Sequence, residues 1–480
     1  MKVIENIGYR SAARLVTFSL QAGTSIVLAR HLSARDYGIV GYAAIFVSFL
    51  ARFKDLGLGS ALVQRKALDA RATNTAWSLR VVLGAVAFCL ALPASRLAAV
   101  GFGDRVVSSV LLVLSLDFLV SSIGFIPSFL MVRALDYRRW IRPMIAAAVV
   151  RTAVACWLAV NGFRFWSIVI AELASSLTQA VYFVCLDHRK LEFQWDKGMA
   201  RELLRFGVPL FSSGLAIFVL FNADNFIVGA VSGAVALGYY ALAFNWGAIV
   251  CSSVSELVHS VLFPAFARMQ HDRERLRQSY LRVLEQLSAL GVLVYVGLFC
   301  CAREFLVIVL GGGGAKWLPA CHALQILCIY GVMRLMLEPV GNVLIAMGRT
   351  RLIFRANLIA ACCEIVLLYP ALVIGGINAV AVVVTISYGV SWLVFWPAVR
   401  DDLNVGIPDM KRMLSPAFTA GVGAWGAGAA VESALPFGIP TFGLMMVTIT
   451  LVFVALQGWL SSWRWLEEWR PVYWALVRCA

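Results

Sequence analysis

Charged residues are scarce in this chain: only 14% of its 480 residues are Asp, Glu, Lys or Arg, whereas 61% are hydrophobic. A soluble chain of this length would fold as two or three domains. The composition, with a mean hydropathy of +0.84, excludes that class. The sequence therefore predicts an all-α, polytopic membrane protein.

Motifs for metal and nucleotide chemistry are also missing. The eleven cysteines lie mostly inside apolar runs, and no CxxC or Cys/His spacing suggests a metal site. Four glycines precede Lys316, but Trp317 stands where a phosphate-binding loop needs Ser or Thr. The sequence has no DxD pair of the kind that nucleotide-sugar transferases use and no ATPase motif. No loop is large enough to form a domain. We therefore expect no cofactor, no metal and no enzyme activity, and we expect energy to come from a gradient or from the substrate.

Apolar runs of about 20 residues, the length that crosses a bilayer, recur along the chain. They predict about fourteen transmembrane helices, at residues 11–30, 37–57, 75–95, 106–131, 142–160, 164–186, 203–230, 235–262, 280–302, 319–345, 352–374, 378–399, 411–430 and 438–460.

The positive charges lie in alternate loops. With a cytoplasmic N-terminus, 30 of the 41 lysines and arginines fall in cytoplasmic segments, seven fall outside and four lie within spans. This bias predicts that both termini are cytoplasmic, and it accounts for the net charge of +15 without a nucleic-acid partner. The tail at 461–480 mixes tryptophans with charges, which predicts a helix in the cytoplasmic headgroup layer.

The chain contains an internal repeat. A shift near 200 residues covers an even number of spans, so the two halves share one orientation, as in transporters with parallel repeats. We expect a six-helix lobe at 1–200, a second at 201–400, two added helices at 401–460 and the tail at 461–480. The matched pairs are Ala34 with Ala234, Gly38 with Gly238 and Ala43 with Ala243 and, at a shift of 212, Pro127 with Pro339, Ala134 with Ala346 and Arg139 with Arg351.

The first apolar run is dotted with polar residues that a lipid-facing helix would not tolerate, so it should face a wet space. These residues are Arg14, Thr17, Ser19, Gln21, Thr24 and Ser25. Together with Leu28-Ala29-Arg30, Asp36-Tyr37-Gly38 and the run from Asp55 to Arg65, this stretch resembles the opening helix pair of the oligosaccharide-lipid flippases. Those proteins are the polysaccharide-transporter (Wzx-type) branch of the superfamily that also holds the lipid II flippase and the multidrug extruders.

The resemblance implies a flippase that moves an undecaprenyl-diphosphate-linked oligosaccharide from the inner to the outer leaflet of a bacterial plasma membrane. The two six-helix lobes would work by alternating access, for exopolysaccharide, O-antigen or capsule synthesis. The implied partners are this lipid-linked oligosaccharide, membrane lipids, and the polymerase and chain-length components of a polysaccharide pathway. Two alternatives remain: an ion-coupled multidrug exporter of the same fold, and a membrane glycan polymerase or ligase.

Four arginines lie within predicted spans, where a charge costs about 2.5–3.5 kcal/mol at mid-bilayer. As a set they predict a cationic cavity, because a guanidinium matches phosphate oxygens and keeps its charge at depth. Arg52 and Lys54 should stand at the mouth of this cavity. A structural pairing of each arginine with a buried carboxylate stays open. The predicted substrate-binding residues are Arg14, Arg52, Arg80, Arg151 and Arg334.

Six carboxylates also lie in predicted spans: Asp117, Glu172, Asp224, Glu256, Glu338 and Glu364. A carboxylate in an apolar span can bind Na⁺ or take up a proton. We regard Asp224, Glu256, Glu338 and Glu364 as candidates for a coupling ion. Salt bridges to the arginines are the alternative that remains open.

Overall fold

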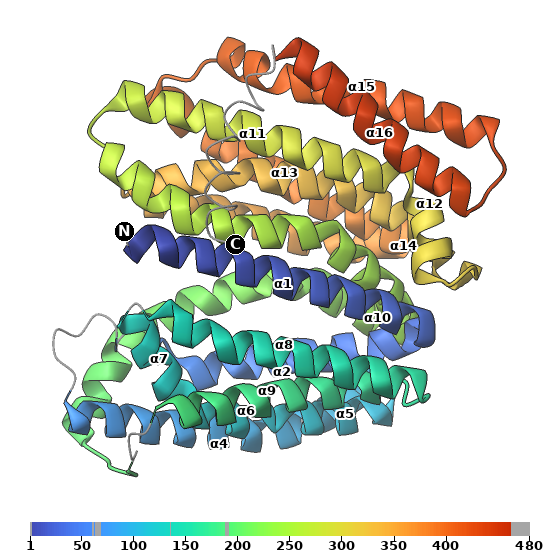
Figure 1. Cartoon of the computed structure of the whole chain (residues 1–480). Coiled ribbons are helices and arrows are strands. Elements are labelled where there is room, and N and C mark those ends of the chain that lie inside the picture. The colour runs from blue at the N-terminus through green and yellow to red at the C-terminus, as the bar shows by residue number, and fades with distance from the viewer. Residues whose placement is uncertain (1, 60–61, 63–68, 135, 188–191, 462–480) are drawn as a thin grey trace. The chain divides into compact units, whose positions relative to one another are not determined.

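The computed structural model describes residues 2–59, 62, 69–134, 136–187 and 192–461. These residues form helices and no strand, which confirms the all-α prediction (Figure 1). Ten helical segments among them are long and apolar enough to cross a membrane, which confirms a polytopic membrane protein. The count of fourteen spans stays a prediction, and the predicted tail at 461–480 lies, apart from Ser461, outside the described residues.

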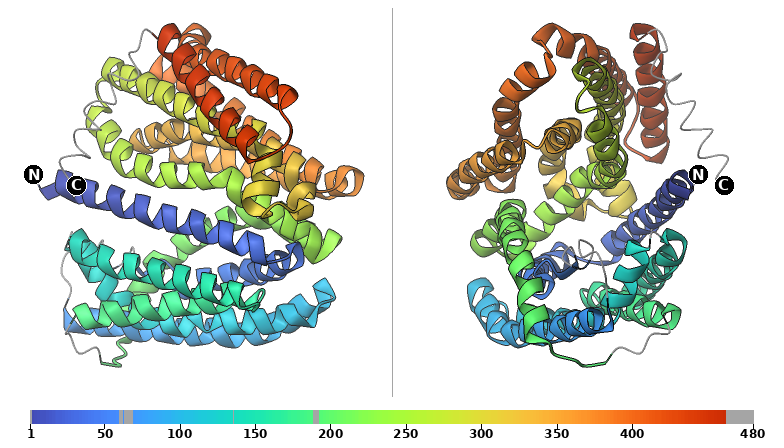
Figure 2. Two further views of the ribbon diagram at one scale, coloured as in Figure 1. Left: turned by 45° about the vertical axis from the view of Figure 1, so that its right-hand side comes forward. Right: turned by 90° about the vertical axis from the view of Figure 1, so that its left-hand side faces the viewer.

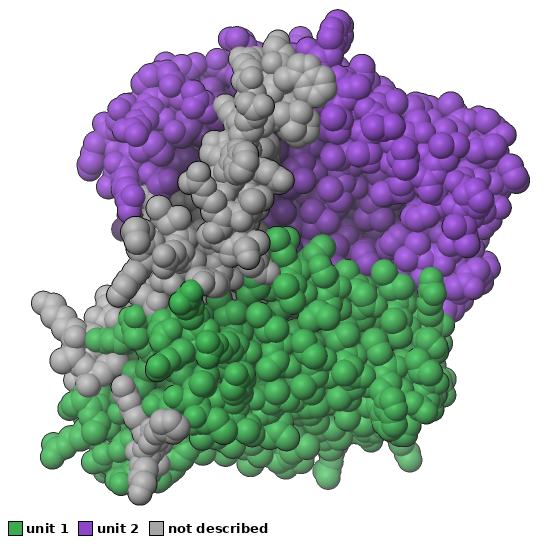
Figure 3. Space-filling model, viewed as in Figure 1, with its two compact units in different colours: residues 1–238, 479 green, residues 239–478, 480 purple. Residues whose placement is uncertain are grey.

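Contacts between Cα atoms divide the chain into two compact units, residues 1–238 and 239–478 (Figure 3). The helices up to the boundary are α1 (Lys2–His31), α2 (Ala34–Asp55), α4 (Ala70–Phe102), α5 (Arg105–Ser115), α6 (Asp117–Ile123), α7 (Phe125–Arg133), α8 (Tyr137–Val160), α9 (Trp166–Leu186) and the first part of α10 (Lys197–Met269). The second unit continues with α11 (Arg273–Cys300), α12 (Ala302–Glu304), the π-helix Phe305–Leu310, the 3₁₀ helix Ala315–Ala320, α13 (Cys321–Ala346), α14 (Thr350–Leu403), α15 (Ile407–Ala434) and α16 (Ile439–Leu460). The predicted lobe boundaries are not tested by this division and stay predictions.

Two glycines interrupt the longest helices. Gly233 in α10 has a φ of 79° and Gly376 in α14 has a φ of 60°, values that glycine adopts without steric cost. The break at Gly233 falls between the predicted spans 203–230 and 235–262, and the break at Gly376 falls between 352–374 and 378–399. Each long helix therefore consists of two membrane-length segments.

Helix α2 begins with a capping box, in which the Ser33 side chain accepts from the Asp36 N–H and the Asp36 carboxylate accepts from the Ser33 N–H. One turn later, α2 meets the α10 segment that starts after Gly233. A Cβ on Gly38 would lie 1.7 Å from the carbonyl oxygen of Ala234, and a Cβ on Gly238 would lie 1.8 Å from that of Ala34. The residues that match in the repeat thus contact each other reciprocally, through two Ala-xxx-Gly motifs that let backbones touch.

Within the first unit, α2 packs on α4 and α5, and α1, α8 and α9 run side by side (Figures 1 and 2). Within the second unit, α11 contacts α13 and α15, and α15 pairs with α16. Large apolar side chains stay exposed on the outer helix faces, for example Val100 at 82% and Ile374 at 86%. Such faces suit lipid, since a water-exposed surface would not carry so many of them.

Candidate functional site

The inner end of α2, taken as the cytoplasmic end by the predicted topology, gathers several charged residues of the first unit. Arg80, buried on α4, donates from Nη1 to the carbonyl oxygen of Lys54 at 2.8 Å and forms an ion pair with Asp55. Its guanidinium carbon lies 4.5 Å from the centroid of the Phe125 ring. Arg80 therefore ties the end of α2 to α4, and its predicted part in substrate binding stays a prediction.

Lys54 and Arg52 point in different directions, because residues two apart on a helix do not share a face. Arg52 is exposed, with its guanidinium 5.9 Å from the Phe218 ring centroid. Lys54 is 95% buried, and its Nζ donates to Ser121 Oγ at 2.6 Å. The prediction that Lys54 stands at a cavity mouth is therefore wrong: its chain lies inside the first unit.

The other predicted residues of the first unit lie on three different helices. Arg14 is half-buried on α1. Arg151 Nε on α8 lies 3.1 Å from Glu172 Oε2 on α9, so the two form an ion pair between helices. Both side chains are partly exposed. Asp224 on α10 is 2% exposed and accepts from the backbone N–H and the side-chain amide of Asn225, at 2.7 and 3.0 Å.

In the second unit, one face of α13 carries a column of polar side chains, Tyr330, Arg334, Glu338 and Asn342, each four residues from the last. Arg334 Nη1 donates to Tyr330 Oη at 2.8 Å, and the Glu338 carboxylate accepts from Ser255 Oγ of α10. The sequence prediction included Arg334 and Glu338 and missed Tyr330 and Asn342. Their four-residue spacing was the signal that could have found them.

The polar column continues onto neighbouring helices. Tyr388 of α14 meets the Tyr330 ring edge to face, with centroids 4.8 Å apart. Ser255 Oγ is 3.7 Å from Cys251 Sγ, and the backbone N–H of Cys251 donates to Tyr295 Oη of α11 at 3.1 Å. The column therefore joins α10, α11, α13 and α14 inside one unit.

An apolar groove adjoins this column. It encloses about 420 Å³ between α11, α13 and α15. Its lining includes Tyr295, whose hydroxyl belongs to the polar network, and Met333 and Met336 of α13. Arg334 itself does not line the groove, so the polar column and the groove occupy different faces of α13.

Two candidate coupling residues remain in the second unit. Glu364 is 3% exposed and accepts from Ser387 Oγ at 2.9 Å, which links the two segments of α14. The side chain of Glu256 lies outside the described residues. No group of His, Cys, Asp or Glu side chains within the described part of the chain could hold a metal ion.

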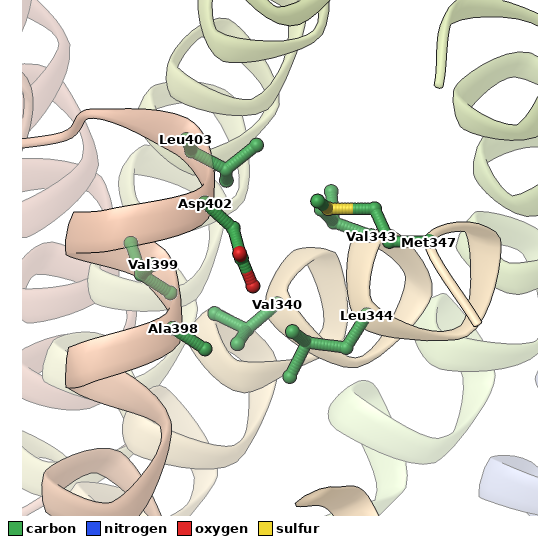
Figure 4. Close-up of a pocket in the computed structure, with 8 residues that line it drawn as sticks. All are labelled: Val340, Val343, Leu344, Met347, Ala398, Val399, Asp402 and Leu403. Atoms are coloured by element: carbon green, nitrogen blue, oxygen red, sulfur yellow. The ribbon is translucent and has the colours of Figure 1, made fainter. Parts of the chain in front are cut away.

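A small crevice at the ends of α13 and α14 is not a site (Figure 4). Apolar side chains such as Val340, Leu344 and Val399 line it, and it has no room for a water molecule. Its one acidic residue, Asp402, accepts from Arg349 Nη2 at 2.7 Å.

Three carboxylates outside the predicted spans have shifted pKa values. The hydrogen bond from Arg35 lowers the pKa of Asp104. The backbone N–H of Gly406, together with Arg277 at 3.0 Å, holds the pKa of Asp409 below its ordinary value. Burial raises the pKa of Glu304, which is 2% exposed. Asp409 thus favours its charged form at the start of α15, and Glu304 resists ionisation.

Comparison with known proteins places these features in context. The family described as polysaccharide biosynthesis protein matches residues 27–322. The lipopolysaccharide biosynthesis protein WzxC of Escherichia coli (strain K12) is 25% identical over 393 residues, which cover 81% of this chain and 78% of that protein. The succinoglycan biosynthesis transport protein ExoT of Rhizobium meliloti (strain 1021) is 26% identical over 333 residues, 68% of this chain and 66% of its own.

Among solved structures, the fold is similar to that of the lipid II flippase MurJ in its inward closed conformation. The TM-score is 0.75 at 12% sequence identity, over 98% of this chain and 100% of that one. At this identity the likeness concerns the fold alone, and it confirms the predicted all-α, polytopic fold.

Proposed function

Because the chain belongs to the polysaccharide biosynthesis protein family, we propose that it is a flippase for a lipid-linked oligosaccharide. The substrate is an undecaprenyl-diphosphate-linked repeat unit, carried from the inner to the outer face of a bacterial plasma membrane. The transport feeds exopolysaccharide, O-antigen or capsule synthesis. The names of two relatives, a lipopolysaccharide biosynthesis protein and a succinoglycan transport protein, support this substrate class.

One observation carries the proposal: helix α13 of the second unit carries a guanidinium, Arg334, in its polar column and lines an apolar groove with another face. Arg334 offers a charged fork that suits a diphosphate. The groove beside Tyr295 and Met333 is almost wholly apolar and suits the polyprenyl chain. A substrate with a charged head on a long hydrocarbon tail needs both kinds of surface.

The remaining predicted residues extend this proposal. Arg14, Arg52, Arg80 and Arg151 are proposed to meet the diphosphate or sugars at some stage of the cycle. Asp224, Glu256, Glu338 and Glu364 are proposed to bind the coupling ion. The deep burial of Asp224 and Glu364 supports the choice of these two. The proposed moving parts are the lobes at 1–200 and 201–400, with 401–460 as added helices.

Localisation and partners follow the same reasoning. The ten membrane-length segments make this a multi-pass membrane protein. We place it in the inner membrane with both termini cytoplasmic, on the charge bias of the loops. Polymerase and chain-length components are its proposed partners, and it performs transport, not catalysis. A multidrug exporter of the same fold is the second candidate, but the family match favours glycan precursors.

The test is substrate binding by Arg334 variants. Arg334→Ala removes a charge-assisted contact worth roughly 1.5–3 kcal/mol, so affinity for undecaprenyl-diphosphate-linked oligosaccharide should fall about 10- to 100-fold at about 1.4 kcal/mol per decade. Arg334→Lys keeps the charge without the fork and should recover part of the loss. The matched control is Arg400→Ala, since Arg400 is 71% exposed. Wild-type affinity in a folded Arg334→Ala variant would remove Arg334 from the site.

A further inference from the structure

The fourth predicted span is the most interrupted helix of the first unit. Residues 106–131 form three short helices, with breaks at Leu116, between α5 and α6, and at Gly124, between α6 and α7. Hydroxyls compete for backbone carbonyls beside the first break: Ser115 Oγ donates to Leu112 and Ser121 Oγ to Asp117, at 2.7 and 2.6 Å. Leu116 itself keeps helical dihedral angles, with φ −58° and ψ −25°, so the chain continues in a helical course through the first break.

A carboxylate stands at this break. Asp117 Oδ1 accepts from Ser176 Oγ of α9, and Asp117 Oδ2 lies 3.4 Å from Lys54 Nζ of α2. The same ammonium donates to Ser121 Oγ at 2.6 Å and lies 5.3 Å from the Phe118 ring centroid. The ion pair therefore joins α2 to α6, and the Ser176 hydroxyl connects it to α9.

The other charges around the pair are engaged with each other. Arg80 of α4 is paired with Asp55 of α2, and Glu172 of α9 is paired with Arg151 of α8. Both Arg80 and Asp55 still act on Lys54 at longer range, with opposite signs. Lys54 and Asp117 are therefore each other's direct charge partner in the described part of this unit.

The two partners differ in access. The Lys54 side chain is 6% exposed, whereas the Asp117 side chain is 30% exposed. A proton can therefore reach the carboxylate while the ammonium stays shielded. A metal cation has no place here, because Lys54 Nζ already occupies the position between the Asp117 and Ser121 oxygens.

We propose that Asp117 is a proton-binding site and that Lys54 couples proton binding to the inner end of α2. A proton from water adds to Asp117 Oδ2 and converts the carboxylate to a carboxylic acid, with no other bond made or broken. The buried Lys54 ammonium then loses its counter-charge, a state that is strongly unfavourable. Its side chain must leave the pair, and the end of α2 loosens with it.

Infrared difference spectra of the purified protein test the proton site. On acidification every carboxylate that takes up a proton contributes to the C=O band, so the wild-type spectrum should contain one component that is absent in Asp117→Asn. Because a nearby ammonium favours the carboxylate form, this component should grow in at higher pH in Lys54→Met than in the wild type. The control Asp401→Asn changes an exposed carboxylate and should leave this component intact. Identical titrations in wild type and Asp117→Asn would overturn the site.

Hydrogen exchange tests the coupling. Asp117→Asn mimics the protonated acid, so amides at the inner end of α2, residues 50–55, should exchange at least about tenfold faster than in the wild type. The double variant Lys54→Met/Asp117→Asn carries no uncompensated charge and should restore slow exchange. Unchanged exchange in Asp117→Asn would overturn the coupling, as would fast exchange in a folded double variant. Neither measurement involves transport, so failure here is distinct from failure of the proposed function.

Discussion

At the residue scale, Arg80 shows how a positive charge is held inside a span. It is 95% buried, and it joins the last turn of α2 through Asp55 and the Lys54 carbonyl. Its Nε has no hydrogen-bond partner among the described residues. A buried guanidinium with two of its contacts on one helix end acts first as a tie between α2 and α4.

Replacing Arg80 should therefore lower stability. Arg80→Ala loses two charge-assisted hydrogen bonds but leaves Asp55, whose side chain is 59% exposed, able to reach water. We expect a loss of about 1.5–3 kcal/mol in the free energy of unfolding, seen as lower melting temperature in detergent. Arg80→Ala/Asp55→Ala should lose little more than the single variant. Normal melting combined with weak substrate binding would instead place Arg80 in the substrate site.

The sequence predicted which charges lie in spans, but not what holds them. Arg80 and Asp55 lie 25 residues apart, and Lys54 and Asp117 lie 63 apart, so these pairs form only when separate helices pack. The sequence placed Lys54 at a cavity mouth because it lies near the end of a predicted span. That position does not tell which face of the helix carries the side chain. The polar column on α13 could have been predicted from the sequence. Its members occur every four residues, at Tyr330, Arg334, Glu338 and Asn342.

At the element scale, the crossing of α2 with α10 depends on missing side chains. The carbonyl oxygen of Ala234 occupies the position that a Cβ on Gly38 would need, and Ala34 does the same for Gly238. The contact is backbone against backbone, so neither helix can shift a flexible side chain to make room.

Gly38→Ala should consequently be destabilising, by about 1–3 kcal/mol for an overpacked contact. The matched control is Gly23→Ala, where a Cβ meets nothing within 4 Å. That change should be neutral or stabilise α1 by up to about 1 kcal/mol. Thermal unfolding of the two variants side by side decides the point. Equal melting temperatures would show that the close crossing does not exist.

Helix breaks were predictable where glycine makes them. The gaps between predicted spans coincide with Gly233 and Gly376, because a polar or small stretch between apolar runs marks the turn. The break at Leu116 was not predicted. Its neighbours include no glycine or proline, and the interruption depends on hydroxyl contacts that only the folded chain reveals.

At the scale of the whole molecule, composition was sufficient to predict the fold class. High hydropathy and membrane-length runs predicted the polytopic all-α fold, because a bilayer tolerates little else. The two compact units and their internal packing could not be read in the same way, since apolar helices match many partners equally well.

Topology is the property of the whole chain that the loops predict most strongly. Reporter fusions after Arg205 and Arg275 should report the cytoplasm, because basic residues cluster there. A fusion after Gly312 should report the outside. A reversed result for either side would contradict the fourteen-span arrangement.

The measurement that tests the central claim most directly is lipid flipping in vesicles that contain only this protein. Fluorescent undecaprenyl-diphosphate-linked oligosaccharide is placed in both leaflets, and a membrane-impermeant reagent modifies the outward-facing share. Protein-containing vesicles should let the reagent reach the inner share, and Arg334→Ala should slow this about 10- to 100-fold. Flipping no faster than in protein-free vesicles, with the same protein folded and transporting a cationic drug, would contradict the account.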